Sequence, residues 1–176
     1  MRYSAPARRA FNLAWMPRRA HLFLLHTFRR LPRPARRFAV RRLYPSFTVG
    51  AMAIIEGPDD AVLFVRHSYR RRWGVPGGLL ARGEQPMAGA RREAIEEVAL
   101  DIETIGEPAV VVDARARRVD IVFRARPISE AAIATIHPSS VEIVEARWFP
   151  RDELPEMQHE TAAALASLAR VKLERR

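Results

Sequence analysis

The stretch of sequence that decides the fold runs from Gly78 to Leu100 and reads GLLARGEQPMAGARREAIEEVAL. Pro86 suits the first turn of a helix, which the spacing of the following apolar residues predicts to continue to about Val98. Four apolar side chains are expected to bury one face of this helix: Met87, Ala90, Ala94 and Val98. The stretch therefore predicts an amphipathic helix whose other face is free for polar side chains.

The polar face of this helix is acidic. Glu93, Glu96 and Glu97 stand at positions i, i+3 and i+4, so their carboxylates fall within one turn of one face. Like charges at this spacing repel one another and weaken a helix. A hard divalent cation with oxygen ligands is the natural partner to offset the repulsion, and Glu84 in the preceding loop could fold back as a fourth acid.

The same stretch resembles the Nudix box, G-x5-E-x7-R-E-U-x-E-E-x-G-U, in which U is an apolar residue. The matching residues are Gly78, Glu84, Arg92, Glu93, Ala94, Glu96, Glu97 and Leu100. One position departs from the pattern: the final glycine of the box is Ala99 here, from which we expect a slightly altered helix exit and an intact metal site. The sequences WGVPGG before the box and EARWF after it are also similar to the family, so the resemblance covers about residues 46–175.

The resemblance implies a hydrolase that cleaves the pyrophosphate bond of a nucleoside diphosphate linked to another group. It implies Mg²⁺, with Mn²⁺ as an alternative, bound by Glu93, Glu96 and Glu97 with help from Glu84 and the backbone carbonyl of Gly78. Such a metal screens the charge of the anionic pyrophosphate and lowers the pKa of a bound water.

One carboxylate must take the proton of the attacking water. The resemblance favours Glu97 or Glu96 as both ligand and base, whereas Glu142 and Glu145 are the candidates on a loop outside the box. Arg92 is expected to orient the box carboxylates through charge-assisted hydrogen bonds.

Substrate contacts are expected from side chains on either side of the box. Arg70 and Arg72, with Arg71 between them, precede a glycine-rich bend and could meet phosphate, against the alternative of a solvated turn; Glu142 is the acidic candidate. Trp73 is expected to pack rather than to stack on a base. Three histidines have no spacing typical of a metal site and are expected to be structural or exposed: His67, His137 and His159.

Strands surround the predicted helix. Residues 47–55 and 61–66 are expected to form a hairpin around the turn at 56–60. Further strands are expected at 109–113, 119–125 and 142–149, and a final helix at 159–173. This order indicates a mixed α/β domain, and the resemblance implies the Nudix fold, a mixed β-sheet between helices in an α/β/α sandwich.

Charge divides the 176 residues into two parts. Residues 1–45 carry twelve arginines and no Asp or Glu, whereas residues 46–176 carry eighteen basic and twenty acidic side chains, a net charge of −2. The absence of cysteine excludes disulfides and thiolate chemistry. We place the boundary near Pro45, with a basic, proline-interrupted helical extension at 1–45 and a hydrolase domain at 46–176.

The extension has three interpretations. Helices are expected between Pro17 and Pro32 and over 35–43. They could form a cap packed on the domain or exchanged with a second subunit in a homodimer, a surface for nucleic acid or an anionic membrane, or a disordered leader. Its apolar stretches fall short of the ~20 residues of a spanning helix, and no signal peptide is evident, so a cytoplasmic protein is expected.

Two alternatives to the small-molecule hydrolase remain open. The first is an RNA 5′-end pyrophosphohydrolase whose basic extension grips the phosphate backbone. The second is a catalytically inactive, Nudix-like domain that senses a nucleotide, against which the complete set of box acids argues. Nothing in the sequence past the box selects one substrate.

Overall fold

The computed structural model describes residues 17–173, and the side chains of residues 172 and 173 are outside this description. The chain divides into two compact units, Met1–Ser46 and Phe47–Arg176. The first 16 residues of the predicted extension lie outside the described residues. Within residues 17–173, no helix combines the length and the apolar character needed to cross a membrane.

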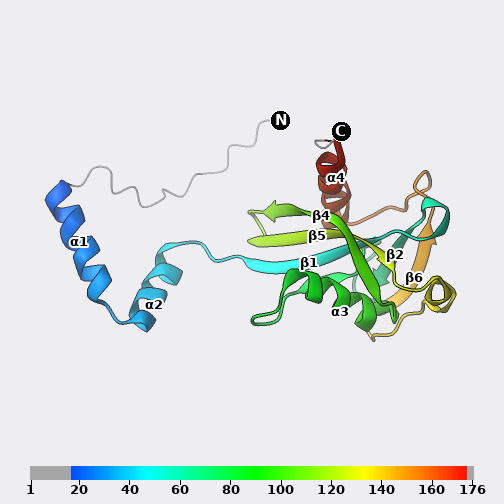
Figure 1. Ribbon diagram of the computed structural model, residues 1–176, viewed down its shortest axis with the longest axis horizontal. Coiled ribbons are helices and arrows are strands. Elements are labelled where there is room, and N and C mark those ends of the chain that lie inside the picture. Colours follow the sequence, from blue (N-terminus) through cyan, green and yellow to red (C-terminus); the bar gives the residue numbers. More distant parts are fainter. Residues whose placement is uncertain (1–16, 174–176) are drawn as a thin grey trace. The chain divides into compact units, whose positions relative to one another are not determined.

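The described part of the first unit consists of two helices, α1 (Arg18–Arg30) and α2 (Arg33–Leu43) (Figure 1). Pro17 and Pro32 directly precede them. Helix α2 begins earlier than the expected residue 35 because Pro34 occupies its first turn, where the missing N–H costs no hydrogen bond. Neither helix contains a buried residue.

The second unit is built on a mixed four-stranded sheet of order β3-β1-β5-β4, of which Figure 1 labels β1, β5 and β4. Its strands are β1 (Thr48–Ile55), β3 (Gly77–Leu79), β4 (Ile102–Asp113) and β5 (Arg118–Pro127). Strand β1 runs parallel to β5 and antiparallel to β3, and β4 runs antiparallel to β5. A separate antiparallel pair joins β2 (Val62–His67) to β6 (Ile143–Phe149).

Two helices cover the two faces of the central sheet. Helix α3 (Pro86–Val98) packs through Ala90, Ala94 and Val98 against Ala51, Ala53 and Ile55 of β1. Helix α4 (His159–Leu173) packs on the other face, mainly against β4 and β5, and its Ala164 and Leu168 belong to the same core cluster as Met52 and Ile54 of β1. Because successive side chains of a strand point to opposite faces, β1 is buried on both sides, and the expected α/β/α sandwich is confirmed. Two short 3-10 helices complete the unit, η2 (Pro58–Asp60) and η3 (Glu130–Thr135).

The predicted hairpin is wrong in its pairing. Strands β1 and β2 share only the isolated bridge between Glu56 and Val62, and β2 pairs along its length with β6. The chain turns a corner at η2, where Asp59 and Asp60 adopt positive φ angles of 52° and 59°. Because of this corner, β1 and β2 belong to different sheets. Two apolar segments on either side of a turn predict two strands, but they do not predict whether the strands pair with each other.

Two strand predictions were also incomplete. The segment read as a glycine-rich bend forms β3, and β4 begins well before the expected residue 109. The pairing of β4 with β5 shifts register between Ile105 and Ala109, where Gly106 has a φ of 68° and Pro108 follows. Glycine and proline are typical of such a bulge. Because they interrupt the alternation of apolar residues, the first half of β4 was not predicted from the sequence.

The two ends of α3 differ from expectation. Met87, expected in the buried face, is 55% exposed, and Gly89 is buried. At the other end Ala99 adopts the left-handed conformation, with φ 56° and ψ 30°. The N–H groups of Ala99 and Leu100 then donate to the carbonyls of Ile95 and Ala94, at 3.0 and 3.3 Å. The expected altered exit is therefore wrong, because alanine takes here the conformation that a glycine would take.

Candidate active site

A cavity of about 620 Å³ opens on the second unit between β3, α3, the loops that flank β2 and β6, and the start of α4. Among the described residues, four that line it carry a buried polar atom without a hydrogen-bond partner: His67 Nδ1, Glu97 Oε2, Ser140 Oγ and Thr161 Oγ1. Buried polar atoms are normally paired, so this concentration in one cavity marks a place for a polar ligand.

Glu97 is the buried acid of the cavity. Its position in the last turn of α3, beside the buried Val98, leaves the residue only 7% exposed. One carboxylate oxygen, Oε1, lies 3.5 Å from His67 Nε2, and the other has no partner among the described residues. Burial raises the pKa of Glu97 and so does the charge of Glu93, whereas His67 and the backbone N–H of Gly77 lower it, and the net direction is upward. An ionised carboxylate in this position is costly without a cation beside it.

Arg92 holds the other acids of the box. Its Nε and Nη2 donate to the two oxygens of Glu84 at 2.8 and 3.1 Å. Its Nη1 donates to Glu93 Oε1 at 2.7 Å and to Glu96 Oε2 at 3.0 Å. The paired guanidinium and the N–H of Ala81 hold the pKa of Glu84 at about 2. One side chain thus offsets much of the like-charge repulsion that the sequence implies.

The donors around Glu97 fit a hard divalent cation. A Cβ added at Gly78 would lie 2.6 Å from the Glu93 carboxylate carbon, so this carboxylate reaches the backbone of β3 and only glycine leaves room for it. Gly78, Glu93, Glu96 and Glu97 all line the cavity, and carboxylate and carbonyl oxygens suit Mg²⁺. Among residues 17–173, no three acidic or histidine side chains already converge in a metal-binding arrangement, because Glu93 and Glu96 are turned toward Arg92. Glu97 keeps the free oxygen.

Two of the residues expected to contact substrate line the cavity. Arg70 is held there by a 2.7 Å hydrogen bond from its Nη1 to Gln158 Oε1. Glu142 lies on another wall and accepts a 3.4 Å hydrogen bond from the hydroxyl of Tyr69. The cavity is therefore bordered by a cation and a carboxylate that lie outside the box.

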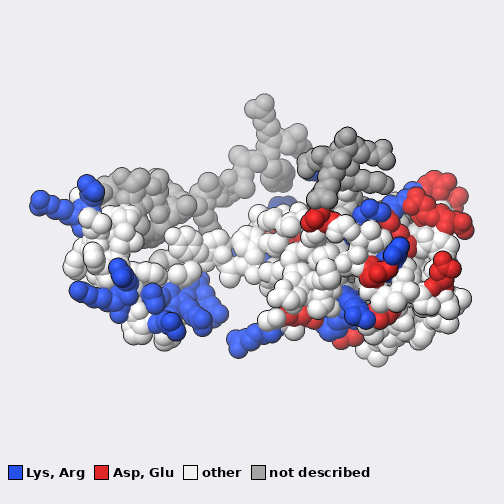
Figure 2. Space-filling view, in the orientation of Figure 1, with Lys and Arg blue, Asp and Glu red and all other residues white. Residues whose placement is uncertain are grey.

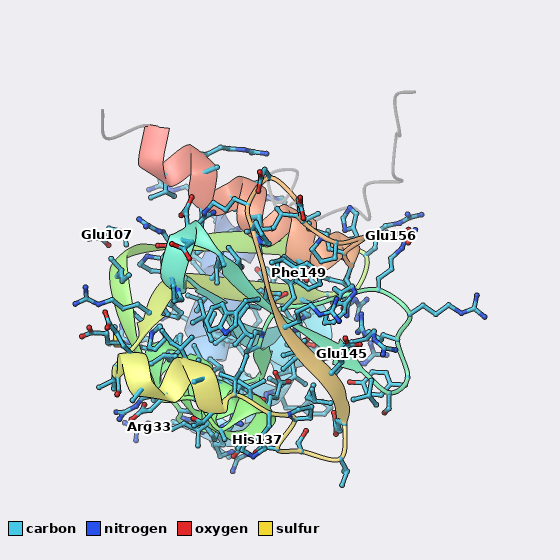
Figure 3. All side chains as sticks on the ribbon, turned by 90° about the vertical axis from the view of Figure 1, so that its right-hand side faces the viewer. Arg33, Glu107, His137, Glu145, Phe149 and Glu156 are labelled. Atoms are coloured by element: carbon cyan, nitrogen blue, oxygen red, sulfur yellow. The ribbon has the colours of Figure 1, made fainter. Side chains whose placement is uncertain are left out.

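Two other candidates are occupied elsewhere. Arg72 pairs at 2.6 Å with Glu156, which lies in the loop before α4 (Figure 3), and Arg72 does not line this cavity. Glu145 lies on β6 (Figure 3), where it accepts a 2.8 Å hydrogen bond from Arg66 of the neighbouring β2, and it does not line the cavity. Of the two candidate bases outside the box, Glu142 lines the cavity, whereas Glu145 is engaged in an ion pair between β2 and β6.

Two residues that line the cavity, His67 and Arg118, were not predicted from the sequence as site residues. His67 was expected to be structural, yet it lines the cavity and contacts Glu97. Arg118 also lines the cavity, and its Nε donates to both oxygens of Asp120, which is 4% exposed. Alternating polar residues at the start of an otherwise apolar strand were the one signal that could have indicated this pair. Nothing in the sequence around His67 indicates its contact with α3.

The NUDIX domain family model matches residues 46–169 of the chain. The chain belongs to the NUDIX hydrolase family. It is thus a member of a family of pyrophosphohydrolases that act on nucleoside diphosphate derivatives and typically use a divalent metal.

Individual NUDIX relatives agree with this assignment. A MutT-like protein of Streptomyces ambofaciens is 27% identical over 119 residues, which cover 68% of this chain and 74% of the relative. A NUDIX hydrolase from Nitrosomonas europaea shares the fold with a TM-score of 0.61 and 26% identity, over 69% of each chain. An ADP-ribose pyrophosphatase from Streptococcus suis, at 23% identity and a TM-score of 0.58 over 72% of this chain and 88% of its own, shows a likeness of fold.

Proposed function

We propose that this NUDIX hydrolase uses Mg²⁺, or Mn²⁺ in its place, to cleave the pyrophosphate bond of a nucleoside diphosphate linked to another moiety. The observation that carries the proposal is the free, buried Oε2 of Glu97 in a cavity shared with Glu93 and Gly78. A cavity of about 620 Å³ is of the size that encloses a small-molecule ligand.

The ligands that we assign to the metal are oxygen atoms of the box. Glu97 and Glu93 supply carboxylates, the backbone of Gly78 supplies a carbonyl, and Glu96 joins them when it turns away from Arg92. Glu84 helps through Arg92, because its carboxylate holds the guanidinium in place from the other side. When bound, the metal screens the charge of the pyrophosphate and acidifies water.

The protein's own groups then position the acids and accept a proton. Arg92 orients Glu93 and Glu96 without lining the cavity itself. We assign the base to Glu97, which is buried in the cavity and whose Oε2 has no hydrogen-bond partner among the described residues. Glu142 is the alternative base, since it lines the same cavity from a loop outside the box.

Cationic and hydroxyl groups on the remaining walls suit an anionic, sugar-bearing substrate. Arg70 and Arg118 provide guanidinium groups for phosphate oxygens. Ser140 and Thr161 provide hydroxyls that have no partner among the described residues. These four groups support binding of a nucleoside diphosphate derivative. The identity of the second moiety of the substrate is a question for the assay described next.

A substrate panel tests the proposal. Nucleotide sugars, dinucleotides and nucleoside triphosphates are incubated with the protein and Mg²⁺, and phosphate release is measured after coupling to a phosphatase. We expect turnover of at least one nucleoside diphosphate derivative, its restoration by Mn²⁺, and its loss with EDTA. Equal turnover with EDTA would refute the metal mechanism, and no turnover of any compound would favour the nucleotide-sensing alternative.

A further inference from the structure

The two helices of the first unit carry a concentrated, unpaired positive charge. Nine arginines lie within α1 and α2, whose surface is rich in basic side chains (Figure 2), and the sequence of residues 1–45 contains no Asp or Glu. None of these arginines has an ion-pair partner among the described residues, whereas in the second unit most of the ion pairs join an arginine to a carboxylate. The charge on α1 and α2 is therefore available to an external anion.

The same helices expose large apolar side chains. Phe23 and Phe38 are 73% and 71% exposed, and Tyr44 and Leu43 at the end of α2 are 61% and 56% exposed. No residue of either helix is buried. Exposed apolar groups in such density mark a surface that binds a membrane, another protein or an apolar ligand.

Charge and apolar surface meet in a groove of about 520 Å³ within this unit. Its apolar lining comes from Phe28 of α1 and Val40 of α2. Its remaining lining consists of four arginines of α2: Arg33, Arg36, Arg37 and Arg41. Guanidinium groups bind phosphate oxygens in a bidentate manner, and the adjacent apolar side chains suit the acyl chains of the same molecule.

We propose that α1 and α2 bind the surface of an anionic phospholipid bilayer, each lying in the plane of the interface. A nucleic acid would neutralise the arginines but leave Phe23 and Phe38 in water, whereas a bilayer with anionic head groups satisfies both sets of side chains. Helices of 13 and 11 residues are shorter than the ~20 residues of a spanning helix, so the interfacial position is the one that fits.

The test uses the full-length protein and vesicles of phosphatidylcholine, with or without phosphatidylglycerol. We expect cosedimentation with the mixed vesicles, little with phosphatidylcholine alone, and release as NaCl is raised, because salt screens the interaction. Hydrolysis of the substrate found in the panel provides a separate readout of the second unit, so that failure of the lipid proposal and of the proposed function are distinguished.

Two variants and their matched controls separate the charge from the apolar contribution. Arg37→Glu should weaken vesicle binding about tenfold, whereas Arg170→Glu, the same change at an exposed position of α4, should not. The double variant Phe23→Ser/Phe38→Ser should also weaken binding at least ~10-fold, because interfacial binding scales with the apolar area inserted, whereas the exposed Ile128→Ser should not.

Other occupants of this surface would give different results. Tight binding to single-stranded RNA, with no binding to the mixed vesicles, would overturn the proposal in favour of a nucleic-acid surface. A dimer in sedimentation equilibrium that the Phe23→Ser/Phe38→Ser variant dissociates, again without vesicle binding, would overturn it in favour of a second copy of the chain. Vesicle binding that is unchanged in both variants would refute the role assigned to α1 and α2.

Discussion

At the scale of single residues, Ala99 ends α3 in a backbone conformation that lowers the stability of the folded domain. Its left-handed conformation brings its Cβ close to the backbone, a strain that glycine avoids. We expect Ala99→Gly to raise the free energy of unfolding by up to about 1 kcal/mol, measured by urea denaturation. The control is Ala88→Gly, at an exposed position in the first turn of the same helix, where no positive φ is relieved; this change should lower the free energy of unfolding by less than about 1 kcal/mol. Destabilisation by both changes would show that Ala99 is not strained.

The residues of the site divide into those that a local pattern encodes and those that the tertiary fold brings in. Glu93, Glu96 and Glu97 were recognisable because one helix carries all three. His67 and Arg118 come from β2 and β5, and their proximity to the box depends on how distant strands are placed. No spacing along the chain encodes that placement. The acidic residues of the cavity could therefore be predicted from the sequence, whereas the residues that line it from β2 and β5 could not.

At the scale of elements, the burial of α3 rests on one narrow apolar face. Val98 is fully buried, whereas Met87, which has the same helical spacing, is 55% exposed because it lies in the first turn. Val98→Ala should therefore cost about 2 kcal/mol of unfolding free energy, and Met87→Ala less than about 0.5 kcal/mol. Urea unfolding of both variants provides the measurement, and equal losses would contradict the assigned face.

Strands were predictable where apolar residues run without interruption and unpredictable where pairing is long-range. The apolar run of β1 located the strand, but its partners β3 and β5 follow later in the chain. Periodicity gives the faces of a strand and not the identity of its neighbour, which explains the wrong hairpin. The bulge at Gly106 likewise depends on the pairing with β5.

At the scale of the whole molecule, the buried core belongs to the second unit. Both core clusters consist of residues between Ala51 and Leu168. Deleting residues 1–45 should therefore change the unfolding free energy of the hydrolase domain by less than about 0.5 kcal/mol and leave its turnover of a small substrate unchanged. A large loss of stability would instead support the interpretation of the extension as a packed cap.

The central claim is that Glu97 is a metal ligand and base rather than a structural acid. The change that tests it is Glu97→Gln, with Glu153→Gln at an exposed position as the control. Without metal, the variant should be as stable as the parent or more stable, because a buried carboxylate with an unpaired oxygen has been removed.

The decisive measurement is the rate of Mg²⁺-dependent hydrolysis of the best substrate from the panel by these two variants. Our account predicts a loss of about 100-fold or more for Glu97→Gln and none for Glu153→Gln. Near-full turnover by Glu97→Gln would contradict the account, and a greater loss in Glu142→Gln would transfer the role of base to Glu142.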